Sequence, residues 1–262
     1  MRPFITLLLF LFLGAQVQAQ ITIERSDFTL EEGLRAVSWD IDYSNASIPE
    51  EGEGMVWDFS ALPLEEGSFT DYLAASSAEL PEANLKEAVT RGILGGVAQR
   101  PGHRFHLLDD TGHGRLGGVD EPAVVPMAAL TGGATDTLKA LETVEVNMER
   151  ESIIQFPLNY GDSWSYDNNA NADFLLTVSA FGLQDTPAGQ ITRDSAGLSV
   201  AGYGTLILPN PSGIGSASVE VLMVKRVREV TFTYTLGGQP APQTMLDVLG
   251  LEQGERQNLT RY

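Results

Sequence analysis

The sequence predicts a mainly β protein, an antiparallel sandwich or a partly closed barrel with one or two short helices. Short runs in which apolar and polar side chains alternate are frequent, and they are typical of strands with one buried face. One such run covers residues 36–43, where Val37 and Trp39 precede Asp40 and Asp42. The chain also holds 27 glycines and 13 prolines, which punctuate these runs as the turns of an antiparallel sheet require.

The same alternation predicts strands over 55–59, 104–108, 152–156, 174–181 and 219–236. In the last of these runs the apolar side chains have odd residue numbers up to Met223 and even residue numbers from Val230 to Tyr234. Successive side chains of a strand point to opposite faces. We therefore expect a β-bulge or a bend near 225–228, of the kind found where a sheet curls.

Helical signals are sparse and cover two segments. In 81–91, Pro81 stands near the first turn and Leu85 and Val89 are four residues apart, as on one face of a helix. The segment 136–146 has a similar pattern. These two segments are the predicted helices.

The first 19 residues have the pattern of a cleavable secretory signal peptide. Arg2 provides the positive start, 4–13 form an apolar run, and Val17 and Ala19 provide a small-x-small cleavage site before Gln20. The apolar run is shorter than the roughly 20 residues that span a bilayer, so we expect no membrane span. Residues 20–262 then form an exported β-rich domain, periplasmic or extracellular, with any sub-boundary near 131–150.

The charge of the chain is strongly negative. It holds 16 basic and 35 acidic residues, for a net charge of −19; without Arg2 the difference is 15 − 35 = −20. Binding to a phosphate backbone depends on clustered lysines and arginines, so we expect no nucleic-acid partner and instead an unknown protein or glycan partner. With no cysteine, the fold has no disulfide and must be stabilised by its core.

Three strings carry a family resemblance: WDFSAL at 57–62, PLNYGDSW at 157–164 and GYGTLILP at 202–209. With the signal peptide, they resemble secreted proteins of Bacteroidota whose activity is not established. The resemblance implies export. Many such proteins carry a C-terminal sorting domain of the type IX secretion pathway, and nothing before Tyr262 resembles one, so the periplasm and free secretion are both expected destinations.

All three histidines, His103, His106 and His113, lie within eleven residues and next to aspartates. Imidazoles and carboxylates together are typical ligands of a divalent metal. If 104–108 is a strand, however, His103 and His106 point to opposite faces and only one of them can join His113. We therefore favour a β-hairpin with arms 104–109 and 115–119 and a turn at 110–114.

The triplet Asp110-Thr111-Gly112 follows two leucines, as in the catalytic loop of aspartic proteases, where paired carboxylates activate water. The match is incomplete because Asp109 interrupts the apolar lead-in and no second such triplet exists in the chain. A homodimer could supply the second aspartate. The alternative function is therefore a secreted hydrolase, aspartic-protease-like or metal-assisted, with Asp110 and His113 as its catalytic residues.

One further segment has the oxygen-bearing residues of a Ca²⁺ loop at alternating positions, namely Asp167, Asn169, Asn171 and Asp173. The EF-hand glycine and bidentate glutamate are replaced by Ala172 and Val178. The competing interpretation is a polar hairpin loop between 163–166 and 174–178. Ca²⁺ is the only cofactor that the sequence indicates.

Five aromatic residues could form a platform for sugar rings or belong to the core: Trp39, Tyr43, Trp57, Trp164 and Tyr166. No G-x-S-x-G, H-E-x-x-H, S-x-x-K or P-loop string occurs in the chain, so the common hydrolase and nucleotide-binding classes lack their usual motifs. The function that the sequence favours is an exported, non-catalytic binding or envelope-associated module.

Overall fold

The computed structural model describes residues 21–38, 49–63, 67–78, 80–94, 96, 98–210 and 215–262. The predicted signal peptide lies outside the described residues, as do Trp39 and Tyr43. The prediction of a mainly β protein with short helices is confirmed, since sixteen strands accompany only the helices α1 (Ala128–Thr131) and α2 (Gln243–Val248) and the 3-10 turns Arg25–Asp27 and Ser179–Phe181 in the described chain. None of the described helices has the length and apolar character needed to cross a membrane.

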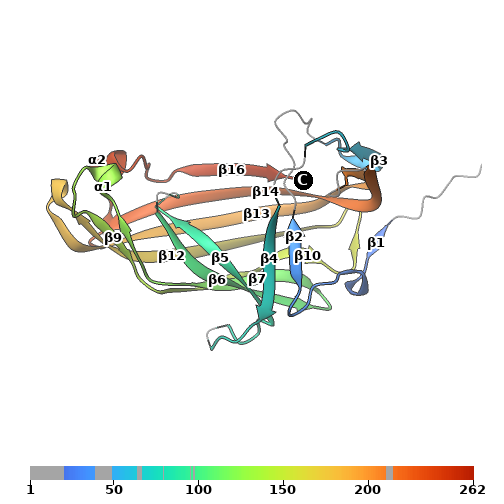
Figure 1. Ribbon diagram of the computed structural model, residues 1–262, viewed down its shortest axis with the longest axis horizontal. Coiled ribbons are helices and arrows are strands. Elements are labelled where there is room, and N and C mark those ends of the chain that lie inside the picture. The colour runs from blue at the N-terminus through green and yellow to red at the C-terminus, as the bar shows by residue number, and fades with distance from the viewer. Residues whose placement is uncertain are drawn as a thin grey trace, which may run out of the picture.

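Three long strands dominate the larger sheet (Figure 1): β12 (Ser163–Val178), β13 (Leu183–Pro209) and β14 (Ser216–Leu236). They pair as consecutive antiparallel hairpins. Shorter strands extend this sheet, namely β8 (Ala123–Pro126), β9 (Thr137–Ala140), β15 (Gln239–Pro240), β16 (Arg256–Arg261) and β3 (Gly52–Asp58). Of these, β3 alone is parallel to its partner, β13.

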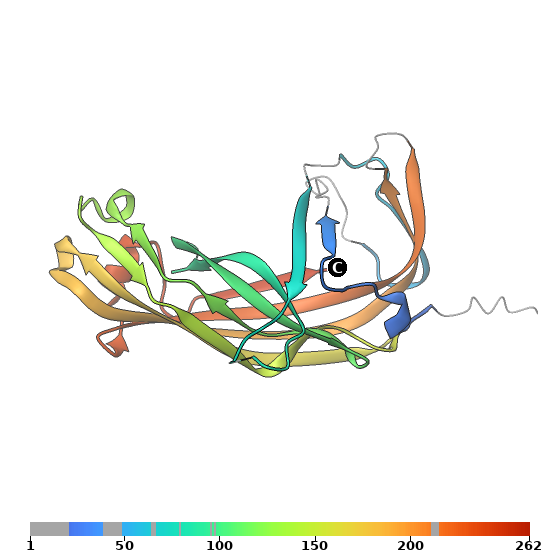
Figure 2. The same cartoon turned by 60° about the horizontal axis from the view of Figure 1, so that its bottom comes forward.

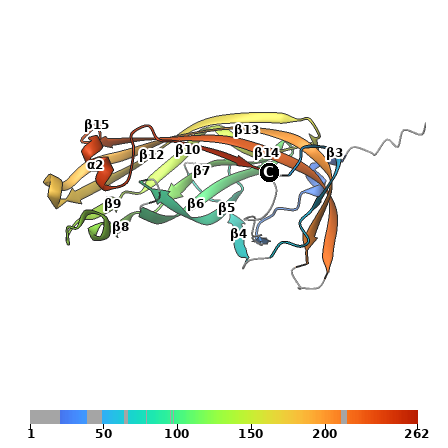
Figure 3. The ribbon, with the colours of Figure 1, turned by 90° about the horizontal axis from the view of Figure 1, so that it is seen from above.

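A second, antiparallel sheet has the order β10-β7-β6-β5-β4-β2. Its strands are β2 (Arg35–Ser38), β4 (Ser68–Ala74), β5 (Leu85–Ile93), β6 (Ala98–Asp109), β7 (Gly112–Asp120) and β10 (Thr143–Gln155). A short ladder joins β1 (Thr22–Ile23) to β11 (Leu158–Asn159). The large sheet is curved, and the second sheet crosses its inner side (Figures 2 and 3), so the two sheets form a half-barrel.

Both predicted helices are wrong. Residues 81–91 lead into and form most of β5, and 136–146 contain β9 and the start of β10. In β5 the spacing of Leu85 and Val89 fits a strand as well as a helix, because four is a multiple of two. The nine-residue ladder between β5 and β6 then decides the structure, since tertiary pairing overrides a weak local preference.

An irregularity occurs a few residues away from the bend predicted at 225–228, and it lies in β13, the strand that pairs with 219–236. The register of β13 and β14 shifts between Val200 and Gly202, opposite Val224 and Met223. Beside this shift β3 approaches β13 closely: a Cβ on Gly204 would lie 2.0 Å from the carbonyl oxygen of Met55. The GYG string is therefore part of the framework, because only glycine permits the approach of β3 at this point.

The main hydrophobic cluster lies at the end of the half-barrel that carries the two α-helices. It joins Ile93 and Ala98 of the second sheet to Phe174 of β12, Tyr234 of β14 and Leu246 of α2. Residues from both sides of 131–150 thus share one core. Two smaller clusters lie around Leu108 and Phe156 and around Tyr166 and Leu198.

The two sheets meet where β10 runs beside β12, and a side chain joins the strands there. The Asn168 carboxamide donates to the carbonyl oxygen of Glu149 (3.0 Å) and accepts from the backbone N–H of Glu149 (3.0 Å). The Trp164 indole N–H donates to the carbonyl oxygen of Ser152 (2.9 Å). Asn168 therefore takes the place of a peptide group and connects the two sheets.

Replacing the buried Asn168 by alanine should lower the free energy of unfolding by about 1–3 kcal/mol, because it removes two hydrogen bonds to the backbone of Glu149, each contributing roughly 0.5–1.5 kcal/mol. Urea denaturation measures the change. Asn169→Ala is the matched control, since Asn169 is the exposed neighbour on the opposite face of the strand, and its effect should stay within about 0.5 kcal/mol. Equal effects of the two substitutions would contradict the role of Asn168.

Candidate functional site

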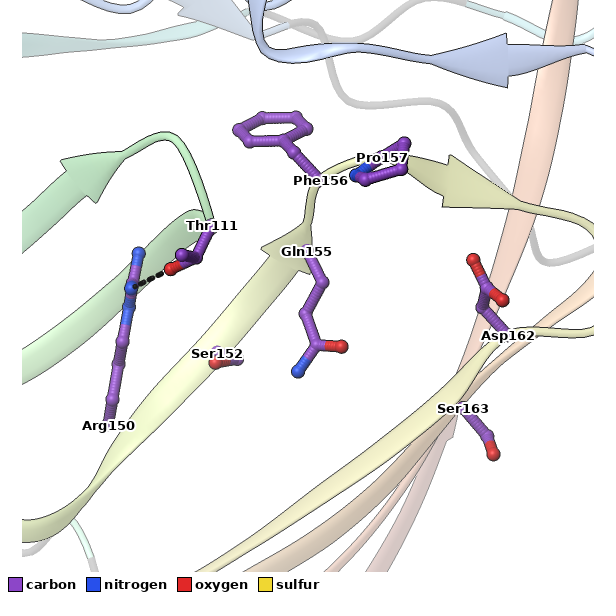
Figure 4. A pocket seen from close by; sticks show the side chains of 8 residues that line it. All are labelled: Thr111, Arg150, Ser152, Gln155, Phe156, Pro157, Asp162 and Ser163. Atoms are coloured by element: carbon purple, nitrogen blue, oxygen red, sulfur yellow. Dashed lines mark hydrogen bonds between the residues drawn. The ribbon is translucent and has the colours of Figure 1, made fainter.

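An open groove of about 570 Å³ is lined by residues from three parts of the described chain (Figure 4). It lies between the β6–β7 turn, the end of β10 and the start of β12. Its lining consists mostly of polar side chains, with one aromatic ring and one proline: Thr111, Arg150, Ser152, Gln155, Phe156, Pro157, Asp162 and Ser163. Its size falls within the range of typical small-molecule sites.

One wall of the groove is fixed by Arg150. Its guanidinium donates to Asp109 (3.1 Å), to the Thr111 hydroxyl (3.1 Å) and to the carbonyl oxygen of Leu107 (3.0 Å). Partial burial favours the protonated form of Asp109, but the hydrogen bonds from Thr111 and Arg150 outweigh it and hold the pKa of this carboxyl below its ordinary value. Asp109 thus remains ionised and anchors the turn, so this wall is preorganised.

The other groups of the groove are available to a ligand. No intramolecular hydrogen bond is made by the side chains of Ser152, Gln155 or Ser163 within the described structure, and Gln155 projects from β10 into the space beside Ser163 (Figure 4). Asp162 accepts one bond from the backbone of Asn159 (2.7 Å). Hydroxyl, amide and carboxylate groups with free hydrogen-bonding capacity therefore face a common space.

The histidine-rich segment forms the predicted hairpin, with a tighter turn at residues 110 and 111. Side chains alternate between the two faces of the strand, and of His103 and His106 only His106 contacts His113, as predicted. The ring nitrogens Nδ1 of His106 and Nε2 of His113 are 3.2 Å apart. The Nε2 atom of His106 lies 3.2 Å from Oε1 of Glu87. Since a carboxylate only accepts, His106 donates to Glu87 from Nε2, and Nδ1 of His106 and Nε2 of His113 share one hydrogen bond.

This pair is buried rather than exposed in a cleft. His106 is 3% and His113 is 4% exposed, and Phe28 and Tyr72 pack against them with ring centroids 5.8 and 6.1 Å away. Burial above all, and then the charges of His106 and Arg150, lower the pKa of His113 to about 4. His113 is therefore neutral at pH 7 and packs inside the fold rather than facing a cleft.

The structure does not bring the two candidate catalytic residues together. Asp110 is exposed at the tip of the turn, whereas His113 faces the interior and contacts His106. The carboxylate that organises the turn is Asp109, which accepts from the backbone N–H of Thr111 (2.8 Å) and of Gly112 (3.1 Å). No hydrogen bond or ion pair links Asp110 to His113 in the described part of the chain.

The four residues of the Ca²⁺ prediction lie in the middle of β12, so the loop predicted at 167–173 is wrong. Asp167, Asn169, Asn171 and Asp173 occupy every second position on the outer face, and at about 3.3 Å per residue they extend along roughly 20 Å of strand. Asp167 pairs with Arg193 (2.5 Å). Such a row does not converge on one ion, and the described residues contain no group of three or more His, Asp or Glu suited to a metal.

The described aromatic residues of the suggested sugar platform belong to the interior. Trp57 is 7% and Tyr166 is 3% exposed, and Trp164 packs against the cluster that contains Tyr166. They lie on different strands, β3 and β12. The groove near Phe156 and Pro157 was not predicted from the sequence.

A chain of buried ion pairs was also not predicted. Asp120 contacts Arg100 (2.7 Å) and Arg91 (3.2 Å); Arg91 also contacts Glu145. A second pair of arginines, Arg115 and Arg226, shares Glu151. These side chains fill the space between the two sheets, where a β-sandwich usually has apolar residues.

In comparisons with known proteins, no family model, no characterised protein and no solved structure matches this chain.

Proposed function

We propose that the protein is an exported, non-catalytic binding module of the periplasm or the exterior, and that its ligand is a glycan held in the Thr111–Ser163 groove. The observation that carries the proposal is the lining of the groove. Free side chains of Ser152, Gln155 and Ser163 offer both donors and acceptors, which is what a ligand rich in hydroxyl groups requires. The exposed ring of Pro157 provides an apolar contact beside them.

The charges of the groove and of the whole chain favour a neutral ligand in the groove. Arg150 is the one cation among the described residues that line the groove, and Asp109 already neutralises it. With a chain charge of −19, long-range electrostatics would repel a polyanion. A neutral oligosaccharide avoids this cost and can exchange its hydration for the groove's hydrogen bonds.

The carboxylates of the groove favour binding over hydrolysis. Glycoside hydrolases generally use two carboxylates on either side of the scissile bond, about 5–9.5 Å apart. Among the described residues that line the groove only Asp162 is acidic. The alternative of a hydrolase centred on Asp110 and His113 has less support, because one of these residues is exposed and the other is buried.

A glycan array and calorimetry test the proposal. We expect the purified protein to bind one class of neutral oligosaccharide and the double variant Gln155→Ala/Ser163→Ala to bind it at least about tenfold more weakly, because each lost hydrogen bond contributes roughly 0.5–1.5 kcal/mol. Asn171→Ala, on the outer face of β12, is the matched control and should bind normally. If no neutral glycan binds, or if the double variant binds the glycan as well as the control does, the groove is not a glycan site. If the protein releases reducing ends from the bound glycan, it hydrolyses the glycan and the non-catalytic assignment is wrong.

A further inference from the structure

A smaller pocket of about 210 Å³ lies between β10 and the inner face of β13 and β14. It is separate from the groove, although Ser152 contributes to both. Three aliphatic side chains, one arginine, one glutamate and one serine line it: Ile153, Leu198, Val224, Arg226, Glu151 and Ser152. The pocket thus combines an apolar surface with a charged end.

The apolar part of the pocket is continuous with a hydrophobic cluster. Leu198 is 6% exposed and packs with Tyr166, Ala196, Trp164 and Val224. Ile153 lies at the open side and is 43% exposed. An apolar chain placed here would therefore be covered by Leu198 and Val224 and would leave the pocket past Ile153.

The charged end has an excess of positive charge. Arg226 donates to Glu151 (2.9 Å), but Glu151 is shared with Arg115. The other carboxylate near Arg115, Glu145 at 4.0 Å, is itself paired with Arg91, so the arginines of this network outnumber its carboxylates. The Nε atom of Arg226 is buried and has no hydrogen-bond partner among the described residues. A ligand with a negative group can supply the missing countercharge and the missing acceptor.

A further arginine strengthens this excess. Arg261 of β16 lies directly across from Arg226 of β14, and both line a small recess together with Arg228. Arg228 is neutralised by Asp194 (2.7 Å between Nε and Oδ1), whereas Arg261 makes no ion pair with any described residue. Like charges directly opposite each other in a sheet are unfavourable, and an anion between them removes that cost.

We propose that this pocket binds a small amphiphilic carboxylate, with its alkyl chain along Leu198, Val224 and Ile153 and its carboxylate at Arg226, on the side of the neighbouring recess that Arg226 shares with Arg261. The site is independent of the glycan groove. A volume of about 210 Å³, at about 30 Å³ for each water-sized group, accommodates roughly seven non-hydrogen atoms. Octanoate, with part of its chain emerging past Ile153, is therefore a suitable probe.

Isothermal titration calorimetry separates the two parts of the site. We expect octanoate to bind at least tenfold more tightly than either acetate, which has the charge without the chain, or 1-octanol, which has the chain without the charge. The affinity for octanoate should fall as the salt concentration rises. Equal binding of octanoate and octanol, or of octanoate and acetate, would overturn the proposal.

Two pairs of variants locate the site. Ile153→Asp places a negative charge at the exposed rim, so it should weaken octanoate binding at least tenfold without disturbing the core. Ile191→Asp is the matched control, because Ile191, on β13, is similarly exposed (41%) but does not line the pocket. Arg261→Gln should weaken binding several-fold, whereas Arg193→Gln should not. If Ile153→Asp binds octanoate as well as Ile191→Asp does, this pocket is not the binding site.

Discussion

Replacing Asp120 by asparagine should lower the free energy of unfolding by about 3–5 kcal/mol, the usual effect of removing one partner from a buried ion pair. Asp120 and Arg100 are each 2% exposed, and the Asp120 carboxylate is 2.7 Å from Arg100 and 3.2 Å from Arg91. Asparagine has nearly the same shape, so the loss reflects the charge. The buried Arg100 would then have no ion-pair partner among the described residues, and the partly buried Arg91 would keep only Glu145.

Burial already makes the charge of Arg100 costly. Desolvation lowers the pKa of Arg100 below its ordinary value, and the attraction of Asp120 only partly compensates. Its other hydrogen bonds go to the carbonyl oxygen of Leu141 (2.7 Å) and to the hydroxyl of Thr143 (3.3 Å), neither of which carries a full charge. Without Asp120 the desolvation of this guanidinium would be nearly uncompensated.

Urea denaturation at pH 7 measures the effect of Asp120→Asn. Asp71→Asn is the control, because Asp71 forms an exposed pair with Arg35 (2.6 Å) and solvent-exposed pairs contribute little to stability. A loss below about 1 kcal/mol for Asp120→Asn would show that the interior does not depend on this charge. The double variant Asp120→Leu/Arg100→Met should be less destabilised than Asp120→Asn, since it removes both buried charges together.

The strands could be predicted from the alternation of side chains, but their lengths could not. In β12 the outward positions hold Asp167, Asn169 and Asn171, which by local preference favour turns. The inward positions hold residues such as Tyr166 and Asn168, and the strand continues because β13 pairs with it along its whole length. A polar stretch therefore resembles a loop as long as its partner strand is unknown.

Part of the histidine site could be predicted and part could not. Alternation alone predicted that no more than one of His103 and His106 could join His113, and in the structure His106 contacts it. Glu87, in contrast, reaches His106 from a different strand, through the pairing of Leu85 with His106. The register between β5 and β6 is a property of the folded sheet, and no local pattern encodes it.

The charged interior was not predicted for a similar reason. Arg91, Arg100 and Glu151 stand at alternating positions of strands, a pattern that usually indicates a solvated face. Here a second sheet covers that face, so each charge is paired across strands that are distant in the sequence. Burial depends on which sheet covers which face, and that is fixed by the topology.

Acidification from pH 6.5 to pH 4 should remove about 3 kcal/mol of stability through His113 alone. Its pKa falls from 6.5 to about 4 in the folded protein, and each tenfold change in proton affinity corresponds to about 1.4 kcal/mol. Between these values the unfolded chain binds a proton that the folded protein does not, so stability rises with pH in this window. The contribution is complete above pH 6.5 and is lost as the pH falls to 4.

The groups around His113 explain why its pKa is lowered. Burial beside Phe28 disfavours the imidazolium, the charges of His106 and Arg150 repel it, and the attraction of Glu87 is too weak to compensate. Glu87 contributes separately at lower pH. Burial favours its protonated form, but the hydrogen bond and charge of His106 outweigh this and lower its pKa, so its stabilising effect is lost only as the carboxylate becomes protonated.

His113→Gln isolates the contribution of this histidine from the titration of the many other carboxylates. A glutamine amide, which has both a donor and an acceptor, can hydrogen-bond to His106 in place of the imidazole but does not titrate. The variant should therefore lose about 3 kcal/mol less than the wild type between pH 6.5 and pH 4 in urea denaturation. NMR titration of the imidazole resonances should show directly that His113 takes up its proton near pH 4, with His103→Gln used to assign the third histidine. If the free energies of unfolding of the wild type and the variant depended on pH in the same way, this prediction would be wrong. The difference between them varies with pH only if His113 is neutral and buried in the folded protein.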